Sequence, residues 1–341
     1  MEKVAERNKN FMTTDIEGYM EGRRRFSVTL RREKRATQLK LYRYKTSNKE
    51  ISYSDFSFEN LKKISLIANE ITVFLKILEC NFHLSLIEKI HNTKSDEKKL
   101  LALKIFEKMF ENKMPLKYGA LLSIAHMVKD QLIISELYTT QCFSILNQIS
   151  NRNIQIIWDL NLLPSILQHL NLPQVIHLIK NFSFDDTLND ILIKENILSK
   201  LLQHFSSSLN TTCLILLTLS NFASGSPSTI SKLISSPIFN QALNMIDNSN
   251  IYIRKECSYI LYNLSCIGDY DQLTIVNSLV DGVKISNALT FPCYQVHYNY
   301  LIFWIKMKEK NLKPQIDLEI CETLALSKNP DVSKTAQLLL A

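Results

Sequence analysis

Glycine and proline are scarce in this sequence, whose 341 residues include six glycines and eight prolines. Tight hairpins and short α/β connections depend on these residues at their turns, so their scarcity disfavours all-β and α/β folds. Motifs that need glycine at fixed spacing, such as G-x-G-x-x-G, the phosphate-binding loop and the nucleophile elbow, do not occur. No H-E-x-x-H zinc motif occurs either. We therefore expect a protein that is not an enzyme and that uses no metal or other cofactor.

Cysteine pairs and long apolar runs are also lacking. Seven cysteines are scattered without a C-x-x-C pair, which is typical of small buried side chains in a reducing compartment. No apolar run approaches the ~18 residues needed to cross a bilayer, and the N-terminal residues contain no apolar stretch of a secretory signal. We expect a soluble intracellular protein without a membrane partner.

Positive charge is concentrated at the N-terminus. Residues 1–49 hold 14 Lys and Arg against 6 Asp and Glu, a net charge of about +8 on a chain whose total is +7. The remaining residues are close to neutral and are rich in Leu, Ile, Lys and Asn in apolar-periodic runs, which favours helices. The sequence thus joins a basic arm, which we expect to need an acidic partner, to a folded helical body.

The body repeats itself with a period of about 40 residues. Four segments align, and each has Asn at its tenth place and an apolar residue two places earlier. Side chains two and five places before the Asn share one helix face, whereas the Asn and the residue four places before it share another. We expect the first face to be buried in a stack of helices and the second to present a ladder of Asn. The segments are residues 138–150, 172–184, 212–224 and 254–266, with ladder residues Asn147, Asn181, Asn221 and Asn263.

A second short apolar segment precedes the ladder segments at 162–170, 197–205, 238–246 and, more loosely, 283–291. Short apolar helices that recur about every 40 residues are typical of an α-solenoid of armadillo or HEAT type. We therefore expect an all-α fold with a long concave surface for a partner.

Two stretches of the arm, ERNKNF at 6–11 and GRRRFSVTLRREKRATQL at 22–39, place an Arg-x-x-x-Phe element before an Arg cluster and a basic segment. This arrangement resembles the importin-β-binding segment of the importin α family. The resemblance implies that importin β is bound by Arg7, Phe11, Arg23, Arg24, Arg25, Val28, Leu30, Arg31, Arg32, Lys34 and Arg35.

The body resembles the same family in patches. Residues 82–115 are similar to its lead-in and first armadillo repeat, residues 254–282 to a late repeat and residues 318–340 to the terminal repeat. The resemblance implies a right-handed α-solenoid of about seven armadillo repeats. It divides the chain into an importin-β-binding-like arm at 1–45, a linker and lead-in helix at 46–80 and a repeat domain at 81–341.

The resemblance also gives the ladder a role. In importin α, Trp-x-x-x-Asn in each central repeat lines a cargo groove, where the Asn clamps the peptide backbone and the Trp packs against lysine side chains. Here the Asn places are kept, whereas the Trp places hold Phe143, His177, Leu217 and Tyr259. Asp185 and Glu256 match acidic positions that meet cargo lysines. We expect a weakened groove.

The implied function is that of a nuclear import adaptor, in the cytoplasm and nucleus, which binds basic nuclear-localisation-signal cargo and importin β. The resemblance further implies that the arm covers the groove when importin β is absent, and that the C-terminal repeat helps bind the export receptor. Three alternatives remain: a scaffold that keeps importin β binding but has lost ordinary cargo binding, a nucleic-acid-binding protein that uses the arm, and a helical-repeat protein with a solvated basic tail. Val28 and Leu30 beside the arm's charges suit a protein partner better than phosphate.

Overall fold

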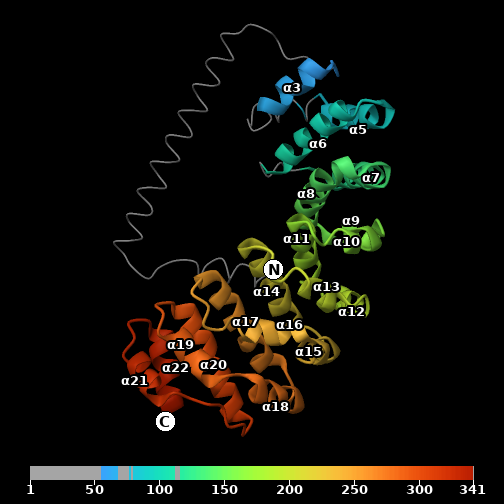
Figure 1. The fold of residues 1–341 in the computed structure, drawn as a ribbon. Helices are drawn as coiled ribbons and strands as arrows, with labels where there is room; N and C mark the ends of the chain where they lie inside the picture. The colour runs from blue at the N-terminus through green and yellow to red at the C-terminus, as the bar shows by residue number, and fades with distance from the viewer. Residues whose placement is uncertain (1–54, 68–76, 78–79, 112–115, 341) are drawn as a thin grey trace. The chain divides into compact units, whose positions relative to one another are not determined.

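The computed structural model describes residues 55–67, 77, 80–111 and 116–340, in which every regular element is helical (Figure 1). These residues belong to two compact units, one within residues 51–242 and one that contains residues 243–341. The all-α prediction is confirmed. The basic arm lies outside the described residues. Within the segment predicted to hold a linker and lead-in helix, 46–80, the structure describes the helix α3 (Phe58–Ile67).

The N-terminal unit is a series of short helices joined by tight turns. Its helices after α3 are α5 (Phe82–Asn92), α6 (Asp96–Glu111), α7 (Tyr118–Ile134), the 3-10 turn η1 (Glu136–Tyr138), α8 (Thr139–Ser150), α9 (Ile154–Asp159), α10 (Leu163–Gln168), α11 (Pro173–Phe182), α12 (Asp186–Lys194), α13 (Ile197–Leu202), α14 (Leu209–Phe222), α15 (Pro227–Ile234) and α16 (Pro237–Leu243).

Two stretches of this unit repeat the same three-helix pattern, in which two short helices lead into a longer third one. The trios are α9, α10, α11 and α12, α13, α14. The third helices, α11 and α14, pack on one another, and α8 packs against α11. The stack continues towards the N-terminus, where α6 packs on α8 and α3 packs on α6. Each expected ladder segment in this unit forms one of these stacked helices, so the repeat read from the sequence is a structural repeat.

Asparagine takes over the turn role that glycine usually has. The residues other than glycine with positive φ in the described part of the chain are all asparagines: Asn81, Asn161, Asn196 and Asn311, with φ between 50° and 57°. Asn tolerates the left-handed conformation better than other residues with a Cβ. This explains how so many helix connections are made with so few glycines.

The C-terminal unit continues the same kind of stacking. Its helices are α17 (Ile251–Ile267), α18 (Tyr270–Leu279), α19 (Gly282–Leu289), α20 (Tyr294–Glu309), α21 (Leu318–Ala325) and α22 (Pro330–Leu340). Helix α17 packs on α20, and α20 packs on α22. The fully buried Trp304 and Tyr300 of α20 are among the largest side chains of this core.

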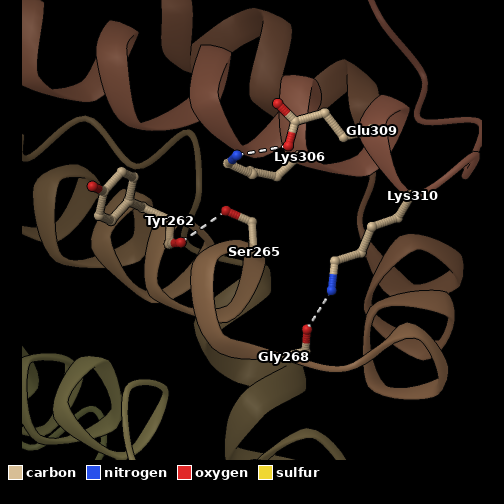
Figure 2. A network of polar contacts seen from close by, with 6 residues as sticks. All are labelled: Tyr262, Ser265, Gly268, Lys306, Glu309 and Lys310. Atoms are coloured by element: carbon tan, nitrogen blue, oxygen red, sulfur yellow. Dashed lines mark hydrogen bonds and ion pairs between the residues drawn. The ribbon is translucent and has the colours of Figure 1, made fainter.

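The C-terminal ends of α17 and α20 are tied together by polar contacts (Figure 2). The Lys310 amino group donates a 2.8 Å hydrogen bond to the carbonyl of Gly268, the residue that caps α17. A cation at this position also opposes the negative end of the helix dipole. Lys306 forms a 2.6 Å ion pair with Glu309 on the same helix, so these two charges largely cancel.

No helix in the described ranges combines the length and hydropathy of a membrane-spanning segment.

Candidate functional site

Three ladder residues occupy equivalent places near the C-terminal ends of the stacked helices: Asn147 on α8, Asn181 on α11 and Asn221 on α14. The apolar residues two places earlier are fully buried, as the repeat predicts. The asparagines themselves are also buried, with 5%, 4% and 7% of their surface exposed. The expectation that they lie on an exposed face is therefore wrong for these three.

Hydrogen bonds between neighbouring helices explain this burial. The Asn181 Nδ2 donates to Ser150 Oγ of α8 at 2.7 Å, and the Asn221 Nδ2 donates to Ser183 Oγ, just after α11, at 2.8 Å. Each serine in turn donates to a carbonyl of its own segment, Ser150 to Asn147 O and Ser183 to Lys180 O. The asparagine side chains are thus aimed along the stack, and each one joins its helix to the preceding one.

Asn147 is held in the opposite direction. Its Nδ2 donates to the backbone carbonyl of Gln174, at the start of the following helix α11, at 2.5 Å, and its Oδ1 is buried without a hydrogen-bond partner.

Asn181 and Asn221 keep hydrogen-bonding capacity beyond their bond to serine, because a side-chain amide carries two N–H donors and a carbonyl with two lone pairs. The small exposed fraction of these two side chains is the part of the ladder that can meet another molecule.

The residues at the Trp places differ in how much surface they offer. Phe143 is fully buried and its ring lies 5.6 Å from the ring of His169, so it presents no surface to a peptide. His177 on α11 and Leu217 on α14 are half-buried. At the Trp places of this unit, the surface that remains exposed therefore belongs to an imidazole and an aliphatic side chain.

His177 is uncharged at neutral pH. Burial, together with the nearby charge of Lys180, lowers its pKa from 6.5 to about 4. The ring therefore does not repel a basic peptide, although Lys180 adds a positive charge one helical turn away. The Lys180 amino group lies 5.2 Å from the ring centre of Phe184, an exposed aromatic side chain just after α11.

Asp185, expected to meet a cargo lysine, is the N-cap residue of α12. Its Oδ1 accepts hydrogen bonds from the backbone N–H groups of Thr187 at 2.9 Å and Leu188 at 3.2 Å, and also from the Thr187 hydroxyl. These bonds lower the pKa of Asp185, with the Thr187 side chain as the largest cause. The carboxylate is ionised at neutral pH, and one of its oxygens caps a helix.

The remaining groove candidates lie in the C-terminal unit. Glu256, Tyr259 and Asn263 are half-buried and follow one stripe of α17, three or four residues apart. The ring of Tyr262, the residue before Asn263, lies 6.4 Å from the ring of Tyr298 on α20, so an aromatic pair bridges these two helices.

One helix-linking asparagine was missed by the sequence reasoning. Asn299 on α20 is 1% exposed, and its Nδ2 donates to Ser258 Oγ of α17 at 2.9 Å. It follows Asn263 by a spacing that fits the repeat, but His297 stands where the pattern has an aliphatic residue. The arm residues expected to bind importin β, from Arg7 to Arg35, lie outside the described residues.

Comparisons with known proteins support the fold. No protein-family model and no curated protein matches the sequence. Among solved structures, one engineered protein aligns with a TM-score of 0.68 at 14% identity over 82% of this chain and 72% of its own. A second engineered protein has a TM-score of 0.57 at 13% identity, covering 66% and 96%.

A designed armadillo repeat protein aligns with a TM-score of 0.48 at 17% identity, covering 75% of this chain and 97% of its own. Likeness at such identities concerns the fold alone. The stacked third helices of three-helix units nevertheless have the armadillo arrangement, and the two stronger likenesses agree with a helical array. The chain has the fold of an armadillo-like α-solenoid.

Proposed function

We propose that this protein is an adaptor of the nuclear import type, which binds an extended basic peptide along its inner helices and importin β through its basic arm. The single observation that supports peptide binding best is the repeated asparagine on α8, α11 and α14, whose side-chain amides are fixed by bonds to neighbouring segments. A donor that is already oriented loses little conformational entropy on binding. The resemblance of residues 6–39 to an importin-β-binding segment supports the second part.

The geometry predicts weak cargo binding. Phe143 and the Oδ1 of Asn147 are buried, and Leu217 offers no aromatic ring. Each missing cation–π contact is worth about 0.5–1 kcal/mol at an exposed site. Since tenfold in Kd is 1.4 kcal/mol, the loss of two such contacts weakens peptide binding by about five- to thirtyfold.

The peptide part is tested by fluorescence anisotropy with a labelled (Lys-Arg)4 peptide at low salt. We expect Asn181→Ala and Asn221→Ala together to weaken binding by about thirtyfold, because each removes about one hydrogen bond of ~1 kcal/mol. Asn240→Ala, at an exposed position on α16, is the matched control and should bind as the unmodified protein does. Equal affinity of all three proteins would refute the groove.

The arm is tested separately with residues 1–50 and importin β. Changing Arg31, Arg32, Lys34 and Arg35 to Ala removes four of the arm's positive charges and should abolish the interaction. Binding that survives this change would mean that the arm has another role.

A second candidate is a scaffold that keeps importin β binding and has lost ordinary cargo binding. The complete burial of Phe143, at one of the four Trp places, favours it. In this case the arm experiment succeeds while (Lys-Arg)4 does not bind, whereas the adaptor requires both. Docking of the export receptor on α21 and α22 is part of the adaptor proposal alone and would be measured with the same full-length protein.

A further inference from the structure

A pocket at the N-terminal end of the described repeats lies apart from the asparagine ladder. Its volume is about 290 Å³, and it is lined by residues from α3, α5 and α6, the turn between α5 and α6, and the segment before α3. The floor is apolar, with the almost fully buried side chains of Leu61, Leu86, Ile90 and Ala102. Such a volume is at the lower end of the ~300–1,000 Å³ of small-ligand pockets, so it suits one large apolar side chain.

Phe56 provides one wall of this pocket and is held in place by stacking. Its ring lies parallel to that of the buried Phe82, with the two centres 5.3 Å apart and an angle of 6° between the planes. The Lys89 amino group is 5.9 Å from the centre of the Phe56 ring. The wall is therefore fixed by contacts within the protein, and a cation stands at its edge.

The polar side chains that line the pocket are two lysines, Lys89 and Lys98, together with Asn92 and Thr93; no lining residue is acidic. Asp55 is a carboxylate close enough to Lys98 to interact with it: its pKa is lowered first by hydrogen bonds from Ser57 and, less strongly, by the charges of Lys63 and Lys98. An apolar floor beneath two amino groups is complementary to an apolar side chain that is flanked by carboxylates.

We propose that this pocket binds an acidic peptide segment of a partner protein, in which a Leu or Phe side chain enters the pocket and neighbouring Asp or Glu side chains meet Lys89 and Lys98. The Asn92 amide and the Thr93 hydroxyl can hydrogen-bond the peptide backbone. The protein's own basic arm has the wrong charge for this site, since residues 1–49 carry a net charge of about +8. The interaction goes beyond the proposed adaptor function, which concerns basic peptides on other helices.

The test uses the full-length protein and the fluorescein-labelled peptide GDELFEDG, with two control peptides. GNQLFQNG keeps the apolar pair without charge, and GDESSEDG keeps the charge without the apolar pair. We expect both controls to bind about tenfold more weakly than GDELFEDG, because each removes one of the two complementary features. Equal binding of either control peptide would overturn the proposal.

Five protein variants locate the site. Lys89→Glu and Lys98→Glu, singly and together, should weaken GDELFEDG binding, by about tenfold in the double variant. Lys94→Glu is the matched control, because Lys94 is exposed in the same turn but does not line the pocket. Asp55→Asn should strengthen binding about twofold, since it removes a negative charge near Lys98.

Circular dichroism of each variant confirms that it is folded, and (Lys-Arg)4 binding should be the same in all five. A double variant that is folded and binds GDELFEDG normally would overturn the proposal. The proposal would also be overturned if GDELFEDG did not bind while octanoate bound saturably and depended on Lys89 and Lys98. The pocket would then be a site for a small carboxylate and not for a peptide. Failure of the groove experiment leaves these outcomes unaffected, because α8, α11 and α14 do not line the pocket.

Discussion

Replacing Ser183 with Ala should reveal how strongly the asparagine ladder couples one repeat to the next. The Ser183 hydroxyl is 2% exposed, accepts a 2.8 Å hydrogen bond from Asn221 and donates a 2.7 Å bond to Lys180 O. Alanine removes both bonds and leaves the Asn221 side chain, itself 7% exposed, with a donor that has lost this acceptor. A buried polar group deprived of its partner costs about 1–3 kcal/mol.

We therefore expect Ser183→Ala to lower the free energy of unfolding of the N-terminal unit by about 2 kcal/mol. This corresponds to a fall in Tm of roughly 4–8 °C for a unit of this size, at about 2–4 °C for each kcal/mol. Asn221→Ala should cost a similar amount, because it leaves the serine hydroxyl without its amide donor and creates a small void. In the double variant the two losses overlap, which gives a coupling free energy of about 1 kcal/mol.

The assay is urea unfolding with 5-fluorotryptophan as a 19F reporter. Trp158 lies in the N-terminal unit, where its ring is 5.9 Å from that of Phe182, and Trp304 lies in the C-terminal unit. The two signals thus follow the two units separately. Strictly additive effects of Ser183→Ala and Asn221→Ala would refute the coupling, as would a loss of stability reported by Trp304 alone.

Three further predictions use the same assay. The pKa of His177 is about 4 in the folded state against 6.5 ordinarily, so the unfolded state binds more protons between these two pH values. The free energy of unfolding should therefore fall as the pH drops from 6.5 towards 4. His177→Phe should remove on the order of 2 kcal/mol of that fall, and an unchanged pH profile would contradict the argument. Lys310→Met keeps the apolar stem but loses the bond to Gly268 O, so the C-terminal unit should lose ~1 kcal/mol, seen at Trp304. Gly282→Ala places a Cβ 2.4 Å from the Gln315 Cβ and should lower the free energy of unfolding by ~1–3 kcal/mol. Gly119→Ala is the control, because no atom lies within 4 Å of its new Cβ, and it should not destabilise the protein. Equal effects of the two substitutions would contradict the packing argument.

The helices and their repeat could be predicted because the underlying signal is local. Residues two and five places before each ladder asparagine share a helix face, and the first of these, Ile145, Ile179, Leu219 and Leu261, are all fully buried. Proline is also found at helix starts, since Pro164 lies in the first turn of α10 and α16 begins at Pro237.

The surroundings of the ladder could not be predicted, because they depend on how one repeat sits against the next. The partner of Asn181 is Ser150, three residues after Asn147, and the partner of Asn221 is Ser183, two residues after Asn181. The sequence pattern of a single repeat does not indicate which residue of the preceding repeat an asparagine will reach. Phe143 shares a face with Asn147 on α8 in any helix, but only the packing of His169 against its ring shows that the face is covered there.

Asn299 was missed for a related reason. The aliphatic pattern used to find ladder helices fails at His297, whose ring is buried and lies 2.7 Å through Nε2 from the carbonyl of Phe291. A buried histidine held by a backbone carbonyl can occupy a place that a hydrophobicity pattern reserves for Leu or Ile. Its pKa is lowered, chiefly by burial, so the neutral ring serves as a core side chain.

The ladder links stability to recognition in a way that constrains both. The hydrogen bond from Nδ2 to a serine of the neighbouring repeat fixes the orientation of each asparagine side chain. In this buried position only 4% of the surface of Asn181 and 7% of the surface of Asn221 is exposed. A peptide can therefore gain a preoriented partner from these amides but little contact area. Most of its contact area must come from half-buried neighbours such as His177 and Leu217, which provide neither a large aromatic face nor a negative charge. Under the proposed function, we therefore expect peptide choice along α11 and α14 to depend more on shape and backbone hydrogen bonding than on attraction to lysine. A variant with Trp at position 217 should then bind lysine-rich peptides more tightly than the unmodified protein does, because the asparagines alone supply no aromatic face.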